Sequence, residues 1–154
     1  MPSSSDGNTY NEAHQELAES LKRLYARGSY SDLEITCQGK SYPVHKAIVC
    51  PRSAFLAAAC SGQFKEASDG RIDLSANDPK AVGAMISYLY CLDHLNSVED
   101  PANSIQAPET CPELVAHTRV YILAEKYLIG GLKTLALRKF TTSVHDHFNV
   151  NSFL

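Results

Sequence analysis

The chain has 154 residues, 44% of them hydrophobic, and its 14 Lys and Arg against 17 Asp and Glu give a formal net charge of −3. A chain of this length forms about one domain and buries roughly 68–70% of the surface that its unfolded form exposes. Since no run of Lys and Arg exceeds two residues, the sequence excludes the basic footprint of a nucleic-acid-binding protein.

The sequence also predicts neither a membrane-spanning nor a secreted chain, because no apolar stretch approaches 18 residues and the N-terminus lacks an apolar segment. The cysteines are odd in number and form no C-x-x-C pair. This usage indicates reduced thiols that serve as packing residues in an intracellular protein, cytoplasmic or nuclear.

Residues 1–9 are rich in Ser, Gly and Asn, and they predict a disordered tail. A helix is predicted from Asn11 to a stop at Gly28. Its apolar residues recur at helical spacing and form one stripe that includes Leu17, Leu21 and Leu24. This stripe packs either on the body of its own domain or on a second copy of the chain.

A β-hairpin is predicted next, with strands at 33–37 and 41–45 around turn residues 38–40. Pro43 has no amide hydrogen to donate, which favours an edge position for the second strand. Residues 71–74 read as a short third strand.

The remaining periodic segments predict helices. Ser53 is the expected N-cap of one helix, and Asp78 followed by Pro79 is the expected start of another. The segment 112–129 is apolar nearly all round and is expected at the centre of the molecule. Residues 93–111 read as a long inserted loop. The expected helices span residues 46–51, 54–60, 80–92, 112–129 and 132–144. The fold class is therefore α+β, with a small three-stranded sheet and five or six helices.

Several short motifs follow one another along the chain: Asp32, His45-Lys46, Ser53, Phe64-Lys65-Glu66 and Tyr88-Leu89-Tyr90. Their order and spacing together resemble the BTB/POZ domain family. The resemblance covers about residues 10–144, and the inserted loop is similar to that of family members common in filamentous fungi. The implied organisation is a domain at 10–145, followed by a tail at 146–154. Adaptors of this family usually continue into further helices and a substrate-reading domain, so this chain is either part of a longer protein or packs its apolar tail elsewhere.

Asp32, His45 and Lys46 stand at the ends of the predicted hairpin and allow two interpretations. A catalytic role requires a nucleophile and an oxyanion site, and no framework for these accompanies the pair. The favoured interpretation is a structural polar clamp in which His45 donates to Asp32, because buried polar groups need partners. The family resemblance implies further that Asp32 and Lys46 border a charged pocket at a dimer surface.

Two interaction surfaces follow from the resemblance. Phe64 and Glu66 resemble the hydrophobic-x-Glu element that some family adaptors present to the cullin-three scaffold of ubiquitin ligases. The alternative is a Phe that folds back onto its own domain beside a solvated Glu. The first helix is expected to contribute to a two-fold dimer interface. That expected interface consists of Leu17, Leu21, Leu24, Tyr25, Asp32 and Lys46.

No metal site or cofactor is expected. His145 and His147 lie two positions apart, so a helix places them on different faces. The predicted function is a non-catalytic interaction domain that homodimerises and acts as an adaptor for a cullin-three-type ubiquitin ligase. The alternative is an oligomerisation scaffold in transcriptional or signalling control without ligase contact, and an enzyme is the third hypothesis.

Overall fold

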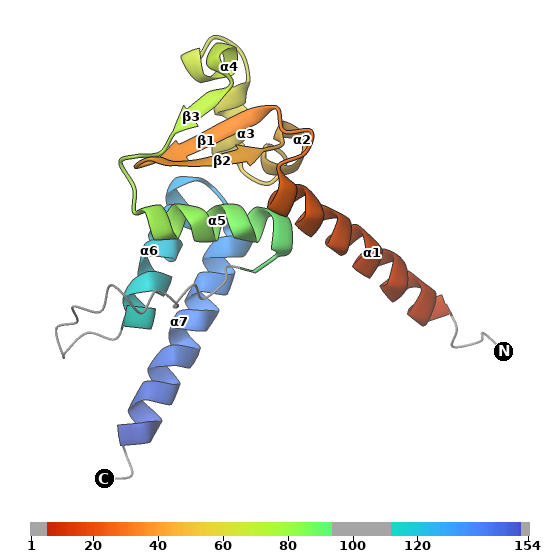
Figure 1. Ribbon diagram of the computed structural model, residues 1–154. Helices are drawn as coiled ribbons and strands as arrows, with labels where there is room; N and C mark the ends of the chain where they lie inside the picture. Colours follow the sequence, from red (N-terminus) through yellow and green to blue (C-terminus); the bar gives the residue numbers. More distant parts are fainter. Residues whose placement is uncertain (1–5, 94–111, 152–154) are drawn as a thin grey trace.

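The computed structural model describes residues 6–93 and 112–151 (Figure 1). In chain order these residues form α1 (Asp6–Arg27), β1 (Leu33–Cys37), β2 (Lys40–Val44), α2 (Lys46–Val49), α3 (Ala54–Cys60), α4 (Lys65–Asp69), β3 (Arg71–Asp73), α5 (Pro79–Cys91), α6 (Pro112–Lys126) and α7 (Gly130–Asn151). The predicted loop at 93–111 lies outside the described residues except for Asp93, as do residues 1–5 of the predicted disordered tail.

The sheet has the strand order β2-β1-β3, with β1 at its centre. β1 pairs antiparallel with β2 and parallel with β3, so that Ile35 lies between Tyr42 and Ile72. The two residues between β1 and β2, Gln38 and Gly39, both have positive φ, which is the geometry of a tight hairpin turn. β2, which contains Pro43, lies at one edge of the sheet, so the predicted edge position of this strand is confirmed.

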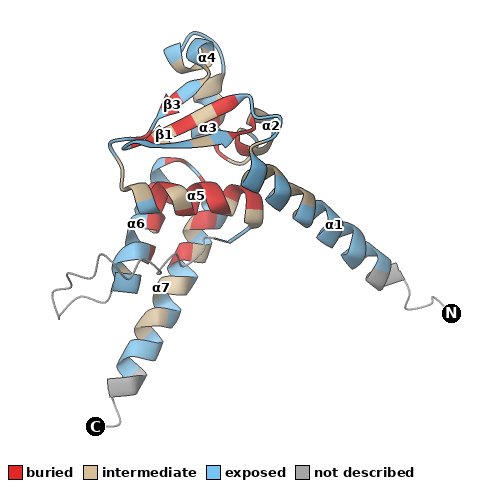
Figure 2. Ribbon diagram, viewed as in Figure 1, coloured by how far each residue is buried: buried red, intermediate tan, exposed pale blue. Residues whose placement is uncertain are grey.

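The core lies between this sheet and α5. β1 alternates buried and half-buried residues, and its buried side chains are Leu33, Ile35 and Cys37. α5 is buried along most of its length, and Asp78 and Pro79 open it as predicted, with the Asp78 carboxylate accepting from the Ala81 amide at 2.9 Å. Figure 2 shows the buried residues concentrated at α5, β1 and the adjoining end of α7.

The helices differ from the sequence prediction in several places. α1 begins at Asp6, so a helix includes residues 6–9 of the predicted disordered tail. The described residues contain seven helices rather than five or six, because α4 is a short helix whose residues were expected in a loop. α6 is buried on one face only, through His117, Val120, Leu123 and Ala124, and it is not enclosed on all sides as expected. α7 continues to Asn151, so a helix includes residues 146–151 of the predicted tail.

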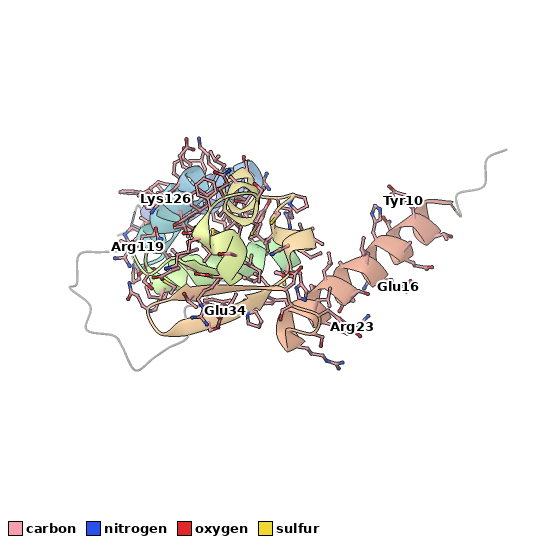
Figure 3. The ribbon with its side chains drawn as sticks, turned by 90° about the horizontal axis from the view of Figure 1, so that it is seen from above. Tyr10, Glu16, Arg23, Glu34, Arg119 and Lys126 are labelled. Atoms are coloured by element: carbon pink, nitrogen blue, oxygen red, sulfur yellow. The ribbon has the colours of Figure 1, made fainter. Side chains whose placement is uncertain are left out.

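Two helices extend beyond the body of the molecule. α1 and the C-terminal part of α7 project from it in different directions (Figure 1). The outer part of α1 is mostly exposed (Figure 2), and a view from above shows Arg23 near the sheet, with Glu16 and then Tyr10 further out (Figure 3). No helix among the described residues is both long and apolar enough to cross a membrane.

Candidate interaction surfaces

The inner end of α1 is fixed to the core by aromatic packing. Leu24 and Tyr25 pack against the core, and the Tyr25 ring stacks on Tyr90 with centroids 5.3 Å apart and 26° between the planes. Burial raises the pKa of the Tyr25 hydroxyl, as expected for a phenol held at the edge of the core. The two innermost residues of the predicted stripe therefore contact the chain itself.

The outer end of the same stripe continues past the body. Leu21 is half-buried, while Leu17, one turn further out, is 61% exposed. Residues four and seven positions apart share one helix face, so Leu17 continues the line that Leu21 and Leu24 begin. The stripe is thus covered at one end and open to solvent at the other.

The segment between α1 and β1 presents a feature that was not predicted from the sequence. Tyr30 adopts a φ of 63° and is 90% exposed. A bulky residue in the left-handed region is a backbone outlier, and such strain gathers at functional positions. The position of Tyr30 two residues after Gly28 was its only sequence signal. Tyr30 and Leu17 are both exposed, and along the chain they follow and precede the fixed end of α1.

The hydrogen bonds of His45 correct the predicted polar clamp. His45 is buried, and its ring nitrogens contact the Tyr90 hydroxyl through Nδ1 at 2.7 Å and the Ser29 carbonyl through Nε2 at 2.5 Å. Since a carbonyl only accepts, Nε2 donates, which leaves Nδ1 of a neutral ring to accept from Tyr90. The predicted bond from His45 to Asp32 is therefore wrong, because both ring nitrogens have other partners.

Asp32 instead has a capping role. Its carboxylate accepts from the backbone amide of Lys46 at 2.8 Å, at the first residue of α2. Asp32 is exposed and Lys46 is half-buried, so both lie at the surface beside the buried His45. The hairpin is held to its neighbours by two separate contacts, one made by His45 and one by Asp32.

The Tyr90 hydroxyl is central to this arrangement. It accepts from the backbone amide of His45 at 2.8 Å while donating to the ring of the same residue. Burial raises the pKa of Tyr90 to about 12, so the phenol keeps its proton and remains a donor. In the sequence Tyr90 stood out only as part of a motif, and its contact with His45, which lies 45 residues earlier, was not predicted.

Phe64 and Glu66 lie at the start of α4. Phe64 is the residue preceding this helix and is 60% exposed, so it does not fold back into the core. Glu66 is half-buried in the first turn, where a carboxylate interacts favourably with the helix dipole. The structure thus places an exposed aromatic side chain two residues before an acidic one.

A third apolar surface lies on the last two helices. Ile122 on α6 and Leu128 in the turn that follows are each 60% exposed, and Leu137 on α7 is 53% exposed. Leu128 has a φ of 57° and so turns the chain sharply between the two helices. Val115 and Ile122 are both exposed on α6, which explains why its sequence reads as apolar nearly all round although only one of its faces is buried.

A match to the family model for the BTB/POZ domain covers residues 21–109, more than half of the chain. The chain belongs to the BTB/POZ domain family. The BTB domain of zebrafish PATZ1 has the same fold, with a TM-score of 0.62 and 12% identity over 86% of this chain and 94% of that one. The BTB domain of human gigaxonin gives a TM-score of 0.56 and 18% identity over 80% of this chain and 90% of that chain.

Curated relatives of this BTB chain are longer proteins. Human Kelch-like protein 30 is 25% identical over 76 residues, which are 49% of this chain and 13% of that protein. Protein maternal effect lethal 26 of Caenorhabditis elegans is 26% identical over 123 residues, 79% of this chain and 27% of that protein. The BTB chain therefore spans less than a third of the length of these relatives.

Proposed function

We propose that this BTB domain is a non-catalytic protein-interaction module that forms a homodimer and recruits a cullin-three-type scaffold of a ubiquitin ligase. The observation that carries the proposal is that the domain has two separate exposed surfaces. One is the outer end of the apolar stripe on α1, and the other is the aromatic residue Phe64 at α4. Each surface has its own experiment.

The dimer proposal rests on the outer end of the α1 stripe. Leu17 is exposed although Leu24, on the same face, packs against the core. In a dimer with a two-fold axis, each chain covers the exposed stripe of the other chain. Asp32 and Lys46, beside the base of α1, are proposed as the polar rim of this interface.

Light scattering tests the dimer directly. We expect a solution mass of twice the 16.9 kDa of one chain. Burial of one Leu side chain contributes about 1.5–3 kcal/mol to the dimer. A two-fold dimer contains two copies of Leu17, so the contribution is doubled. We therefore expect Leu17→Lys to weaken dimer affinity on the order of a hundredfold or more. Gln15→Lys is the matched control, because it adds the same charge on a different face of α1. A wild-type chain that stays at 16.9 kDa at high concentration overturns the dimer.

The ligase proposal rests on Phe64 and Glu66. An exposed aromatic side chain supplies apolar area to an interface, and a nearby carboxylate sets register and orientation. The geometry of α4 supports this use, because Phe64 is exposed before the first helical residue.

A pull-down with the N-terminal domain of a cullin-three-type scaffold tests this surface. We expect Phe64→Ala combined with Glu66→Ala to abolish capture, while Gln63→Ala, an exposed neighbour, retains it. Equal capture of wild type and the double variant shows that the site is elsewhere. Capture by neither, with the dimer intact, favours the alternative function, an oligomerisation scaffold in transcriptional or signalling control.

A further inference from the structure

Two cysteines approach each other where α2 and α3 pack together. Cys50 directly follows the last residue of α2, and Cys60 is the last residue of α3. The two helices are in contact and lie side by side near one end of the sheet (Figure 1). Both cysteines are half-buried free thiols, so each keeps part of its surface exposed to solvent.

The contacts of Cys50 direct its sulfur towards Cys60. Cys50 Sγ lies 3.8 Å from the carbonyl oxygen of Leu56. In an α-helix this carbonyl faces the residue four positions later, which is Cys60. The Cys50 sulfur therefore lies beside the last turn of α3, the turn that ends at Cys60.

The other described cysteines are placed differently. Cys37 is fully buried in β1, and its thiol donates to the Leu74 carbonyl at 3.3 Å. Cys91 ends α5, away from the α2–α3 contact along the chain. Cys50 and Cys60 are thus the described cysteines that lie on the two helices α2 and α3.

We propose that Cys50 and Cys60 form a reversible thiol–disulfide site, which a hydroperoxide oxidises and a dithiol reduces. One sulfur attacks the outer oxygen of the hydroperoxide, so that the O–O bond breaks, an alcohol leaves and a sulfenic acid forms. The second sulfur attacks the first, the S–O bond breaks and water leaves. In total two thiols lose two electrons and two protons, and one hydroperoxide becomes one alcohol and one water.

The environment of the pair determines how fast this reaction proceeds. Burial, followed by the hydrogen bond with Cys60, raises the pKa of the Cys50 thiol to about 11. Because the thiolate is the nucleophile, Cys50 attacks slowly at neutral pH and faster as the pH rises. The disulfide joins α2 to α3 around the turn that contains the Ser53 cap.

Mass spectrometry of the full chain tests the proposal. The reduced protein is treated with hydrogen peroxide at about pH 7 and about pH 9, and free thiols are then alkylated. We expect the intact mass before alkylation to fall by two hydrogen atoms. After alkylation we expect the oxidised protein to carry two fewer alkyl groups than the reduced control, and its protease digest to contain a peptide pair joined through Cys50 and Cys60. Dithiothreitol reverses the change, and the rate is higher at the higher pH.

Variants identify the partner sulfur. Cys60→Ser is expected to abolish the two-hydrogen loss, while Cys91→Ser retains it. A cross-link of Cys50 to any other cysteine, or conversion to sulfinic acid without a disulfide, overturns the proposal. Peptide mapping of the wild-type chain identifies the joined cysteines even if Cys60→Ser folds poorly, and none of these readouts depends on the dimer or on cullin binding.

Discussion

The hydroxyl of Tyr90 satisfies two polar groups of His45 at once, lying 2.8 Å from its backbone nitrogen and 2.7 Å from Nδ1 of its ring. The third polar atom of His45, Nε2, donates to the Ser29 carbonyl just after α1. Through this buried pair, α5 is connected to the start of α2 and to the segment that leads from α1 into the sheet.

Tyr90→Phe removes this hydroxyl while keeping the ring. Because the amide and Nδ1 of His45 are then left unsatisfied in a buried position, we expect the free energy of unfolding to fall by about 1–3 kcal/mol. Urea denaturation measures the loss. Tyr88→Phe is the control on the same helix, where the hydroxyl lies against Gly131, and it is expected to cost less. Equal losses in the two variants contradict the role assigned to Tyr90.

Ser53 joins two distant parts of the chain through one oxygen. Its Oγ accepts from the Leu56 amide at 3.2 Å and donates to the Tyr127 carbonyl at 2.7 Å. Ser53→Ala removes a helix cap and leaves a carbonyl without its donor, so we expect a loss of about 1–3 kcal/mol in thermal or urea unfolding. Ser61→Ala, which removes an exposed hydroxyl at the other end of α3, is expected to change stability by less than about 0.5 kcal/mol.

Gly28 and Gly70 share a φ of 63° but differ in their surroundings. A Cβ atom on Gly28 lies 2.7 Å from Cγ of Pro43, whereas one on Gly70 meets nothing within 4 Å. Gly70→Ala is therefore expected to lower the free energy of unfolding by about 1–2 kcal/mol through backbone strain alone. Gly28→Ala has the same strain and in addition a steric clash with Pro43 of β2. We expect Gly28→Ala to lower the midpoint of thermal unfolding more than Gly70→Ala does. The reverse order rules out close packing of the α1 terminus on β2.

Acid sensitivity is expected from His117, which is buried on α6. Burial, followed by the charge of Lys139 on α7, lowers the pKa of His117 below its ordinary value of 6.5, while Glu113 opposes this shift. The unfolded chain then binds the proton more readily than the folded chain does. Stability is therefore complete above about pH 6.5 and declines as the pH falls towards the folded-state pKa.

Two variants separate His117 from the other histidines. Urea unfolding of His117→Gln is expected to depend less on pH between about 5 and 7 than that of the wild type. His145→Gln, on the exposed part of α7, is expected to keep the wild-type dependence. An unchanged pH profile in His117→Gln shows that the decline has another origin.

Much of the fold follows from patterns within single segments. The alternation of Leu33, Ile35 and Cys37 predicts β1, and Asp78 followed by Pro79 predicts the start of α5, because both signals lie in consecutive residues. α4 was missed because it has only five residues, too few to show a helical period, and begins after Phe64 without a side-chain cap.

The candidate sites were harder to predict because their partners are distant in sequence. Asp32 and His45 were expected to bond since both flank one hairpin, yet the ring of His45 bonds Tyr90, 45 residues later. The exposure of Phe64 and the open end of the α1 stripe depend on what the rest of the chain leaves uncovered. A local pattern carries no information about that.

The position of β1 between an antiparallel and a parallel neighbour has a consequence for how the chain folds. β2 lies within a few residues of β1, so the hairpin closes at a small entropic cost, whereas the contact between Glu34 and Arg71 spans 37 residues. The second edge of β1 therefore stays open until α2, α3 and α4 have emerged and folded back. During synthesis, this exposed edge is therefore open to pairing with another chain.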